Sequence, residues 1–281
     1  MGSLLNKKIT LNDLLNIPYD QAIEYTVDFI KEYVKKAGVK NVVMGLSGGV
    51  DSATVLALLT EALGSDHVTV LIMPDEKVTS KQDVEDAKYL AEIFGVKQYY
   101  IPINNIMGSY KTIPFFDYDD RLATGNLRAR IRMTLLYYYA NKYNAIVIGT
   151  SDRSELLIGY YTKYGDGGAD LLPIGALYKT QVRRLALKLG IPENIAFKPS
   201  SPGLWPHHLA EEELGLRYED IDLVLYSVFD LGVEPDKVPS YTGIPYSVVE
   251  KVLMLHRRSR HKRVFPPIPR YPWLDQPIKE I

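Results

Sequence analysis

The residues best suited to bind a ligand lie near residue 50, between an apolar segment and a helix-like segment. They are Gly45, Leu46, Ser47, Gly48, Gly49, Val50, Asp51 and Ser52. Glycines allow a tight turn whose N–H groups approach a ligand closely, and the amino end of the following helix adds unpaired donors and partial positive charge. Ser47 and Ser52 add hydroxyls, and Asp51 adds a carboxylate where a phosphate-bound Mg²⁺ would lie. The segment therefore predicts a loop that binds an anion such as pyrophosphate.

The same segment differs from two common nucleotide-binding loops. It lacks the Gly-x-x-x-x-Gly-Lys-Ser/Thr pattern of Walker A loops and the Gly-x-Gly-x-x-Gly pattern of dinucleotide turns. It resembles instead the Ser-Gly-Gly-x-Asp-Ser loop of the ATP pyrophosphatases, which cleave ATP between the α and β phosphates and leave an adenylylated substrate. A Ser/Gly-rich turn without a ligand is the alternative, and the strand before it and the helix after it disfavour that interpretation.

A second acidic position follows a different apolar strand. Residues 145–150 predict a buried strand, and two carboxylates, Asp152 and Glu155, lie a few residues beyond its end. Because ligands of parallel sheets bind beyond the carboxyl ends of the strands, a carboxylate here is expected to face Asp51. Two acidic groups from separate loops can share a Mg²⁺ bound to a triphosphate. The alternative is an acidic residue at the start of a helix.

The Gly-rich loop over residues 160–170 combines three tyrosines with Lys163, Asp166 and Asp170. Aromatic faces can stack on a heterocycle, and lysine and aspartate can hold phosphate, ribose or amide groups. Polar Gly-rich loops at strand ends commonly carry binding sites, which favours a functional role. A mobile surface loop is the alternative.

Three arginines, Arg128, Arg130 and Arg132, lie in the first turns of a long predicted helix. Cations at this end oppose the helix dipole. Their placement suggests either an anionic partner or an ion pair with Asp119 or Asp120.

The composition limits the class of protein. The chain has 281 residues, a net charge of −1 and no cysteine. The basic run over residues 256–263 by itself fits a nucleic-acid patch or a solvated helix end. The net charge argues against a nucleic-acid partner. The lack of cysteine excludes disulfides, zinc-thiolate sites and thiol nucleophiles. No apolar run approaches the roughly 20 residues that span a membrane, and the first eight residues lack signal-peptide features. A cytoplasmic enzyme without a membrane partner is therefore expected.

Apolar periodicity predicts alternating strands and helices. The predicted helices cover 19–37, 52–63, 80–94 and 122–143, and the predicted strands cover 41–44, 68–73, 98–103 and 145–150. This alternation predicts an α/β fold, a twisted parallel sheet with helices on both faces. We expect a single domain over residues 1–281, with residues 190–281 packed onto it.

Several segments together resemble the bacterial ammonia-dependent NAD synthetases, members of the ATP pyrophosphatase superfamily with an adenine nucleotide α-hydrolase-like fold. They are the loop 45–52, Gly125–Met133, Gly149-Thr150-Ser151-x-x-x-Glu155, Gly159–Asp170, Glu211–Gly215, Tyr218, Ile221-Asp222 and His261-Lys262-Arg263. The resemblance spans roughly residues 20 to 265 and leaves 266–281 as a C-terminal tail. The sequence departs from the family pattern at 151–154 and 202–210, and it has Tyr160 for Phe and Ser201 for Thr.

The resemblance implies a role for each matching residue. The loop Gly45 to Ser52 binds the ATP phosphates, and Asp51 and Glu155 bind Mg²⁺. The residues Thr150, Lys179 and Ser201 contact ATP, and Asp51, Glu155 and Lys179 form the catalytic set. The expected contacts to deamido-NAD come from Arg130, Tyr160, Lys163, Asp170, His261 and Lys262.

The resemblance further implies that the protein is a homodimer that makes NAD from deamido-NAD, ATP and ammonia through an acyl adenylate. A glutaminase would have to be a separate protein, because glutaminases of this family use a cysteine. Two alternatives stay open: an ATP pyrophosphatase ligase that acts on another carboxylate, and a nucleotide sensor without turnover.

Overall fold

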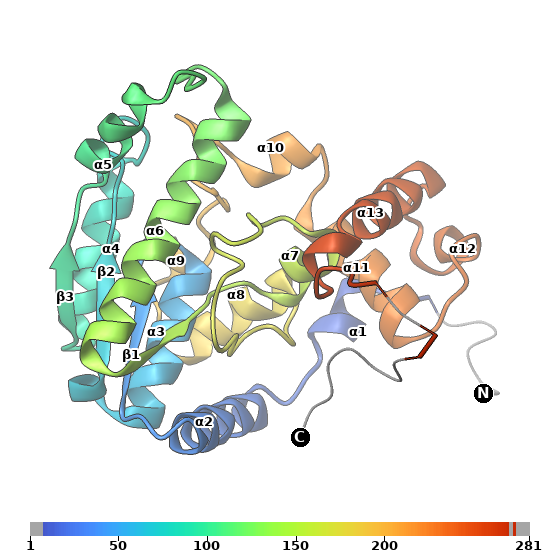
Figure 1. Cartoon of the computed structure of the whole chain (residues 1–281). Coiled ribbons are helices and arrows are strands. Elements are labelled where there is room, and N and C mark those ends of the chain that lie inside the picture. The colour runs from blue at the N-terminus through green and yellow to red at the C-terminus, as the bar shows by residue number, and fades with distance from the viewer. Residues whose placement is uncertain (1–7, 270–271, 274–281) are drawn as a thin grey trace.

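The computed structural model describes residues 8–269 and 272–273, and it contains one four-stranded parallel sheet (Figure 1). The strands are β1 (Asn41–Gly45), β2 (Val68–Ile72), β3 (Lys97–Tyr100) and β4 (Ala145–Ile148). In the sheet they follow the order β3-β2-β1-β4. The predicted parallel α/β fold is confirmed. Most of the tail expected over 266–281 lies outside the described residues.

The strand order reverses beside β1. From β1 the chain steps outward to β2 and β3, and it then returns to the other side of β1 as β4. Val43 of β1 accordingly pairs with Thr69 on one side and with Val147 on the other. The carboxyl ends of β1 and β4 flank the crevice where open α/β sheets bind ligands. Both predicted acidic loops leave the sheet at this crevice.

Helices cover both faces of the sheet (Figure 1). One face carries α2 (Tyr19–Lys36), α3 (Val50–Leu63), α4 (Lys81–Ile93), α8 (Lys179–Lys188) and α9 (Glu193–Ala196). The other carries α5 (Asn104–Ser109) and α6 (Arg121–Tyr143). Side chains alternate accordingly along β1: Val42 and Met44 join the first core and Val43 joins the second. Every residue of β2 is buried, as expected for a parallel strand covered on both sides.

Local signals set most element boundaries. The Ser80 hydroxyl accepts a hydrogen bond from the Asp83 N–H at the start of α4, and Gly64 ends α3 with φ +80°. The strand predicted over 98–103 is shorter, since β3 ends at Tyr100. Pro102 has no N–H to donate to a ladder, and the chain then turns into α5.

The C-terminal helices pack around a third apolar cluster, which lies apart from the two cores of the sheet. They are α10 (Ala210–Leu214), α11 (Tyr218–Leu225), α12 (Val238–Thr242) and α13 (Tyr246–Arg258), joined by α1 (Leu11–Leu15) and α7 (Arg153–Ile158). Short turns of 3-10 helix cover Ser65–His67, Tyr110–Thr112 and Arg260–Lys262, and a π-helical turn covers Tyr226–Asp230. Because α11 contacts both α7 and α8, this cluster is joined to the helices that carry the predicted site. Among residues 8–269 and 272–273, none of the helices combines the length and the apolar character that a bilayer crossing requires.

Candidate active site

The Gly-rich loop is held by its two serines. The Ser47 and Ser52 hydroxyls lie 3.0 Å apart, and Ser52 Oγ donates to the Gly49 carbonyl at 3.0 Å. Gly48 has φ +80°, and a Cβ there would lie 2.2 Å from the Asp83 carbonyl oxygen. Only glycine fits this left-handed turn against α4. The loop is thus a close-packed turn at the end of β1.

The amino end of α3 is left open for a ligand. Side chains of Ser80, Asp120 and Asp152 cap α4, α6 and α7. In the described structure no side-chain hydrogen bond caps α3, whose N-cap is Gly49; α2 and α13 are uncapped in the same way, but α3 begins at the end of β1. The first N–H groups of a helix have no partner in the helix itself, and here they lie beside the crevice between β1 and β4. This arrangement suits an anion.

Lys179 lies at the centre of three carboxylates. Its Nζ is 2.5 Å from Asp51, 3.0 Å from Asp152 and 2.8 Å from Glu155. Lys179 and Asp152 are completely buried, whereas about a fifth of each of the Asp51 and Glu155 side chains is exposed. We call these four residues the carboxylate–lysine cluster. It joins the start of α3, the start of α7 and the start of α8.

The electrostatics of the carboxylate–lysine cluster reflect its burial. Burial raises the pKa of Asp152 to about 6 against the opposing attraction of Lys179, and it raises the pKa of Glu155 as well. Burial alone would lower the pKa of Lys179, but the three carboxylates outweigh it and raise that pKa well above its ordinary value. Three carboxylates against one ammonium leave a net charge of −2 when all are ionised. The cluster therefore carries negative charge and is suited to bind a further cation.

A cavity of about 850 Å³ lies over the loop and the cluster. Among the residues predicted from the sequence, its wall contains Gly45, Leu46, Ser47, Gly49, Val50, Asp51, Ser52, Thr150, Glu155, Tyr160, Ser201 and Lys262. This volume is typical of a site for a nucleotide-sized ligand. The structure thus gathers the phosphate loop, both exposed carboxylates and part of the loop 160–170 around one space.

The cavity wall also brings His208 and Trp205, which no sequence motif indicated, together with Tyr160 and Glu213. The Tyr160 hydroxyl donates to Glu213 at 2.5 Å, and His208 Nε2 lies 2.8 Å from the same Glu213 oxygen. The Trp205 ring stacks on His208 with ring centroids 3.4 Å apart. The hydroxyl that distinguishes Tyr160 from phenylalanine, a departure noted in the sequence, therefore has a defined partner. That departure was the available signal, while the loop that supplies Trp205 and His208 has no regular pattern.

The sequence matches a known family. The family model described as NAD synthase matches residues 22–266. The chain belongs to the NAD synthase family. The NH(3)-dependent NAD(+) synthetase of Staphylothermus marinus is 57% identical over 273 residues, which cover 97% of this chain and 99% of that protein. Because this relative and others of high identity are archaeal, the resemblance to bacterial enzymes in particular is not supported.

Solved structures of the family have the same fold. An NH3-dependent NAD synthetase from Campylobacter jejuni is 32% identical, with a TM-score of 0.75 over 90% of this chain and 100% of that chain. An NMN synthetase from Francisella tularensis is 33% identical, with a TM-score of 0.80 over 91% of this chain and 100% of that chain. Both cover nearly all of the described fold.

Some residues that the NAD synthase resemblance assigned to ligands lie elsewhere. Lys179 lies behind the cavity wall, because its side chain is completely buried and its Nζ contacts the three carboxylates. The wall formed by the described residues does not include Gly48, Arg130, Lys163, Asp170 or His261. Arg130 donates instead to the Lys163 carbonyl at 3.4 Å.

Asp170 has a structural role that its position in a Gly-rich loop did not suggest. Its carboxylate accepts hydrogen bonds from the Val147 N–H at 2.7 Å and from the Tyr137 hydroxyl at 3.0 Å. Its own N–H donates to the Val147 carbonyl at 2.9 Å. Asp170 therefore pairs with the outer edge of β4 and attaches the end of the loop to the sheet.

Of the two alternatives for the arginines, the ion pair with Asp119 or Asp120 is not the one that Arg128 forms. Arg128 pairs with Asp75 at 2.6 Å, not with Asp119 or Asp120, and both members of the pair are buried. Arg128 also donates to the Leu204 carbonyl at 2.8 Å, so it joins the end of β2 to the loop that carries Trp205 and His208. Arg132 donates to the Met73 carbonyl at 2.9 Å.

The end of the basic run also contacts the interior. Lys262 Nζ donates to the carbonyls of Gly159 at 2.6 Å and Tyr161 at 2.5 Å, and Arg263 donates to the Leu157 carbonyl at 2.9 Å. These contacts fix the chain between α7 and the loop 160–170. The two side chains therefore stabilise the cavity wall.

Proposed function

We propose that this protein makes NAD from deamido-NAD, ATP and ammonia and releases AMP and pyrophosphate. The observation that carries the proposal is the uncapped amino end of α3, which faces one nucleotide-sized cavity together with Asp51 and Glu155. A relative that covers 97% of the chain is named as an NH3-dependent NAD synthetase, which supports the same reaction.

The geometry suits an adenylation. A carboxylate is a poor acyl donor, so the nicotinate carboxylate of deamido-NAD attacks the α phosphorus of ATP and the α–β bond breaks. Pyrophosphate leaves toward the N–H groups of the loop 45–52 and the start of α3, which are already oriented for an anion. Ammonia then attacks the acyl carbon of the adenylate, and AMP leaves with the electron pair of the broken C–O bond. Thr150 and Ser201, both in the cavity wall, contact ATP.

Asp51 and Glu155 would hold a Mg²⁺ ion, which when bound supplies positive charge to the phosphate oxygens. The residues fit this ion: Asp51 Oδ1 is a buried oxygen that has no hydrogen-bond partner among the described residues. Two protein carboxylates are a usual number for a Mg²⁺ that also binds substrate phosphates. Lys179 orients both carboxylates from behind, as its contacts to them indicate.

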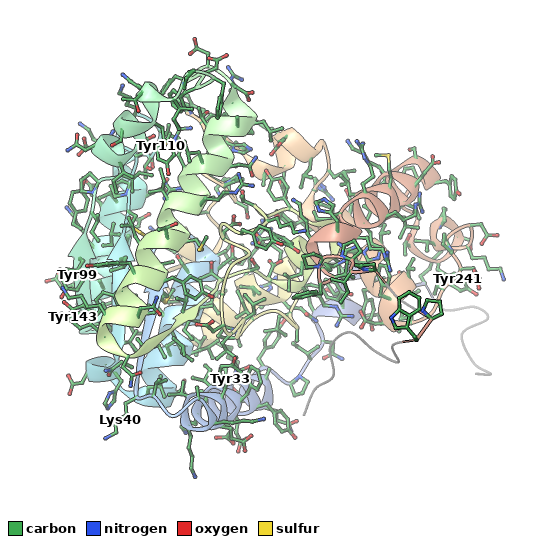
Figure 2. The ribbon with its side chains drawn as sticks, in the orientation of Figure 1. Tyr33, Lys40, Tyr99, Tyr110, Tyr143 and Tyr241 are labelled. Atoms are coloured by element: carbon green, nitrogen blue, oxygen red, sulfur yellow. The ribbon has the colours of Figure 1, made fainter. Side chains whose placement is uncertain are left out.

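We assign the dinucleotide end of deamido-NAD to the face that carries Arg130 and Lys163. On α6, Arg130 shares this face with the exposed Tyr138, two turns further along. An exposed aromatic stripe on α2 consists of Tyr25, Phe29 and Tyr33, spaced four residues apart; Tyr33 is labelled in Figure 2. We propose that a second copy of the chain covers these aromatic side chains and completes the deamido-NAD site.

We expect the protein to be a homodimer in solution, because Tyr25 (75% exposed) and Phe29 (48% exposed) leave an unusually apolar helix face in a monomer. Light scattering should give twice the mass of the chain. Phe29→Lys should shift the mass toward the monomer and weaken deamido-NAD use, whereas a monomeric mass for the parent protein would contradict the proposal.

A cytoplasmic location stays a prediction.

Lys163→Ala is expected to raise KM for deamido-NAD about tenfold and to leave KM for ATP nearly unchanged. Lys163 lies outside the wall of the ATP cavity, and losing one charged contact to a phosphate or carboxylate has roughly this cost. Steady-state kinetics with each substrate varied in turn measure the effect. Lys142→Ala, near the other end of α6, is the control. Equal losses for both substrates would contradict the assignment.

We expect the rate at low total ammonium to rise between pH 7 and pH 9. Only unprotonated ammonia has the lone pair that attacks the acyl adenylate, and its fraction rises by about tenfold per pH unit below the pKa of ammonium. The measurement is NAD formation at fixed ammonium chloride, repeated at saturating ammonium. A pH profile that is the same at both concentrations would contradict control by free ammonia.

The same assay separates the alternatives. Glutamine should not replace ammonium, because the chain has no cysteine to act as a thiolate nucleophile; glutamine-driven synthesis by the pure protein would contradict this. Because one structural neighbour is named as an NMN synthetase, the mononucleotide acid is tested beside deamido-NAD. Faster turnover of the mononucleotide would identify it as the substrate instead of deamido-NAD. If neither compound causes pyrophosphate release, the protein would be a nucleotide sensor without turnover.

A further inference from the structure

Lys198 joins three elements around the Gly-rich loop. It lies between α9 and α10, and its Nζ donates to the Gly48 carbonyl at 2.9 Å. The same Nζ contacts two carboxylates of α4, Asp83 at 2.9 Å and Asp86. Asp86 is held on its other oxygen by Gln82 Nε2 at 2.8 Å. The side chain that contacts the loop is therefore itself held by two carboxylates of α4.

The contacts of Lys198 use all of its donors. A lysine ammonium has three N–H groups, and Gly48, Asp83 and Asp86 are three acceptors. Although Lys198 belongs to the cavity wall, it has no N–H group left for a phosphate in this arrangement. Its charge is balanced by α4, so its effect on a ligand passes through the Gly48 carbonyl.

Holding that carbonyl fixes the direction of a donor. In a planar trans peptide the C=O and the following N–H point in opposite directions. Lys198 therefore holds this peptide at the Gly48 oxygen, while the Gly49 N–H at its other side donates to Ser47 Oγ at 3.3 Å. Glycine at position 48, with φ +80°, would otherwise let this peptide rotate easily.

We propose that Lys198, held by Asp83 and Asp86, is a positioning residue that fixes the Gly48–Gly49 peptide for the pyrophosphate portion of ATP. The proposal rests on the proposed function of the loop 45–52. It also explains how the segment that carries Ser201 is coupled to the phosphate loop, since Lys198 lies three residues before Ser201.

The test is the affinity for pyrophosphate with excess Mg²⁺, measured by isothermal titration calorimetry on the full chain. Lys198→Met should weaken binding by about tenfold or more and should raise KM for ATP but not KM for deamido-NAD. Lys198→Arg should recover part of the loss. Lys188→Met is the control and should bind pyrophosphate as the parent protein does, because among the described residues Lys188 contacts only the exposed Asp20, at 3.0 Å.

Asp86→Asn separates positioning from direct contact by the sign of its effect. If Lys198 bound phosphate directly, removing a competing negative charge beside it would strengthen pyrophosphate binding. If Lys198 acts by positioning, the same change loosens it, and pyrophosphate binds several-fold more weakly. A double variant with Lys198→Met should then add little further loss.

Three results would overturn the proposal. Equal pyrophosphate affinity in the parent protein and Lys198→Met removes the role of Lys198 alone, with NAD synthesis unaffected. Stronger binding by Asp86→Asn replaces positioning by direct contact. No pyrophosphate binding by the parent protein removes both this proposal and the phosphate-loop assignment. A melting curve of each variant checks that it is folded. If Lys198→Met does not fold, the pyrophosphate affinity of Asp86→Asn decides the question.

Discussion

Asp51→Asn and Glu155→Gln are each expected to lower kcat on the order of 10²- to 10³-fold, which is the usual cost of one preorganised group that stabilises developing charge. Each carboxylate belongs to the cavity wall and contacts Lys179 from behind. The amide replacement keeps the shape of the side chain and removes the charge that would attract Mg²⁺. The losses should be seen as a lower kcat and as a higher Mg²⁺ requirement.

The two variants should remain folded. Three carboxylates share one ammonium, so neutralising one of them reduces repulsion between like charges. The melting temperature should be unchanged or higher, while activity falls. A melting temperature that holds or rises while kcat falls distinguishes a lost metal ligand from a damaged fold.

The measurement is kcat over a Mg²⁺ titration, together with a melting curve for each variant. Asp20→Asn is a matched control, because Asp20 is exposed and contacts only Lys188 in the described structure. A near-normal kcat at low Mg²⁺ for either variant would show that its carboxylate is not a metal ligand.

Local patterns predicted the fold well for physical reasons. Buried parallel strands are short apolar runs, and β2 and β4 are of this kind. Helix ends depend on single nearby residues such as Ser80 and Gly64. The position of Asp51 and Glu155 beyond two strand ends followed from the same reasoning, because parallel strands end at one edge of the sheet.

Contacts between distant residues could not be predicted in this way. Lys179 is 128 residues from Asp51, and its own neighbours form an ordinary amphipathic helix. A nearby aspartate was one of two alternatives for the arginines, but the partner of Arg128, Asp75, is 53 residues away. The sequence shows that charges need partners when they are buried, but only the tertiary structure selects which partner is within reach.

The loop between α9 and α10 is the other part that escaped prediction. It has no hydrophobic period, and its residues departed from the family pattern at 202–210. Its position is set by contacts from elsewhere, such as Arg128 to the Leu204 carbonyl and Glu213 to His208. Irregular segments of this kind are determined by side chains that are remote in sequence.

Lys179→Met is expected to destabilise the protein by about 3–5 kcal/mol, the usual cost of removing one member of a buried ion pair. Methionine keeps much of the length of the side chain and removes the only ammonium that contacts Asp51, Asp152 and Glu155 in the described structure. Since Lys179 and Asp152 are both completely buried, water cannot replace the lost cation. The result should therefore be a much larger loss than any exposed lysine would cause.

The loss should also depend on pH in a defined direction. Burial already raises the pKa values of Asp152 and Glu155 in the folded protein, and removing the ammonium raises them further. A carboxyl whose folded pKa lies above its unfolded pKa holds more protons when folded, so stability falls as the pH rises between the two values. The deficit of Lys179→Met should thus be smaller at pH 5 than at pH 8. Urea denaturation with EDTA at both pH values measures it, with Lys188→Met as the control. A deficit that is equal at both pH values, or absent, would mean that the carboxylates do not depend on Lys179 for their charge.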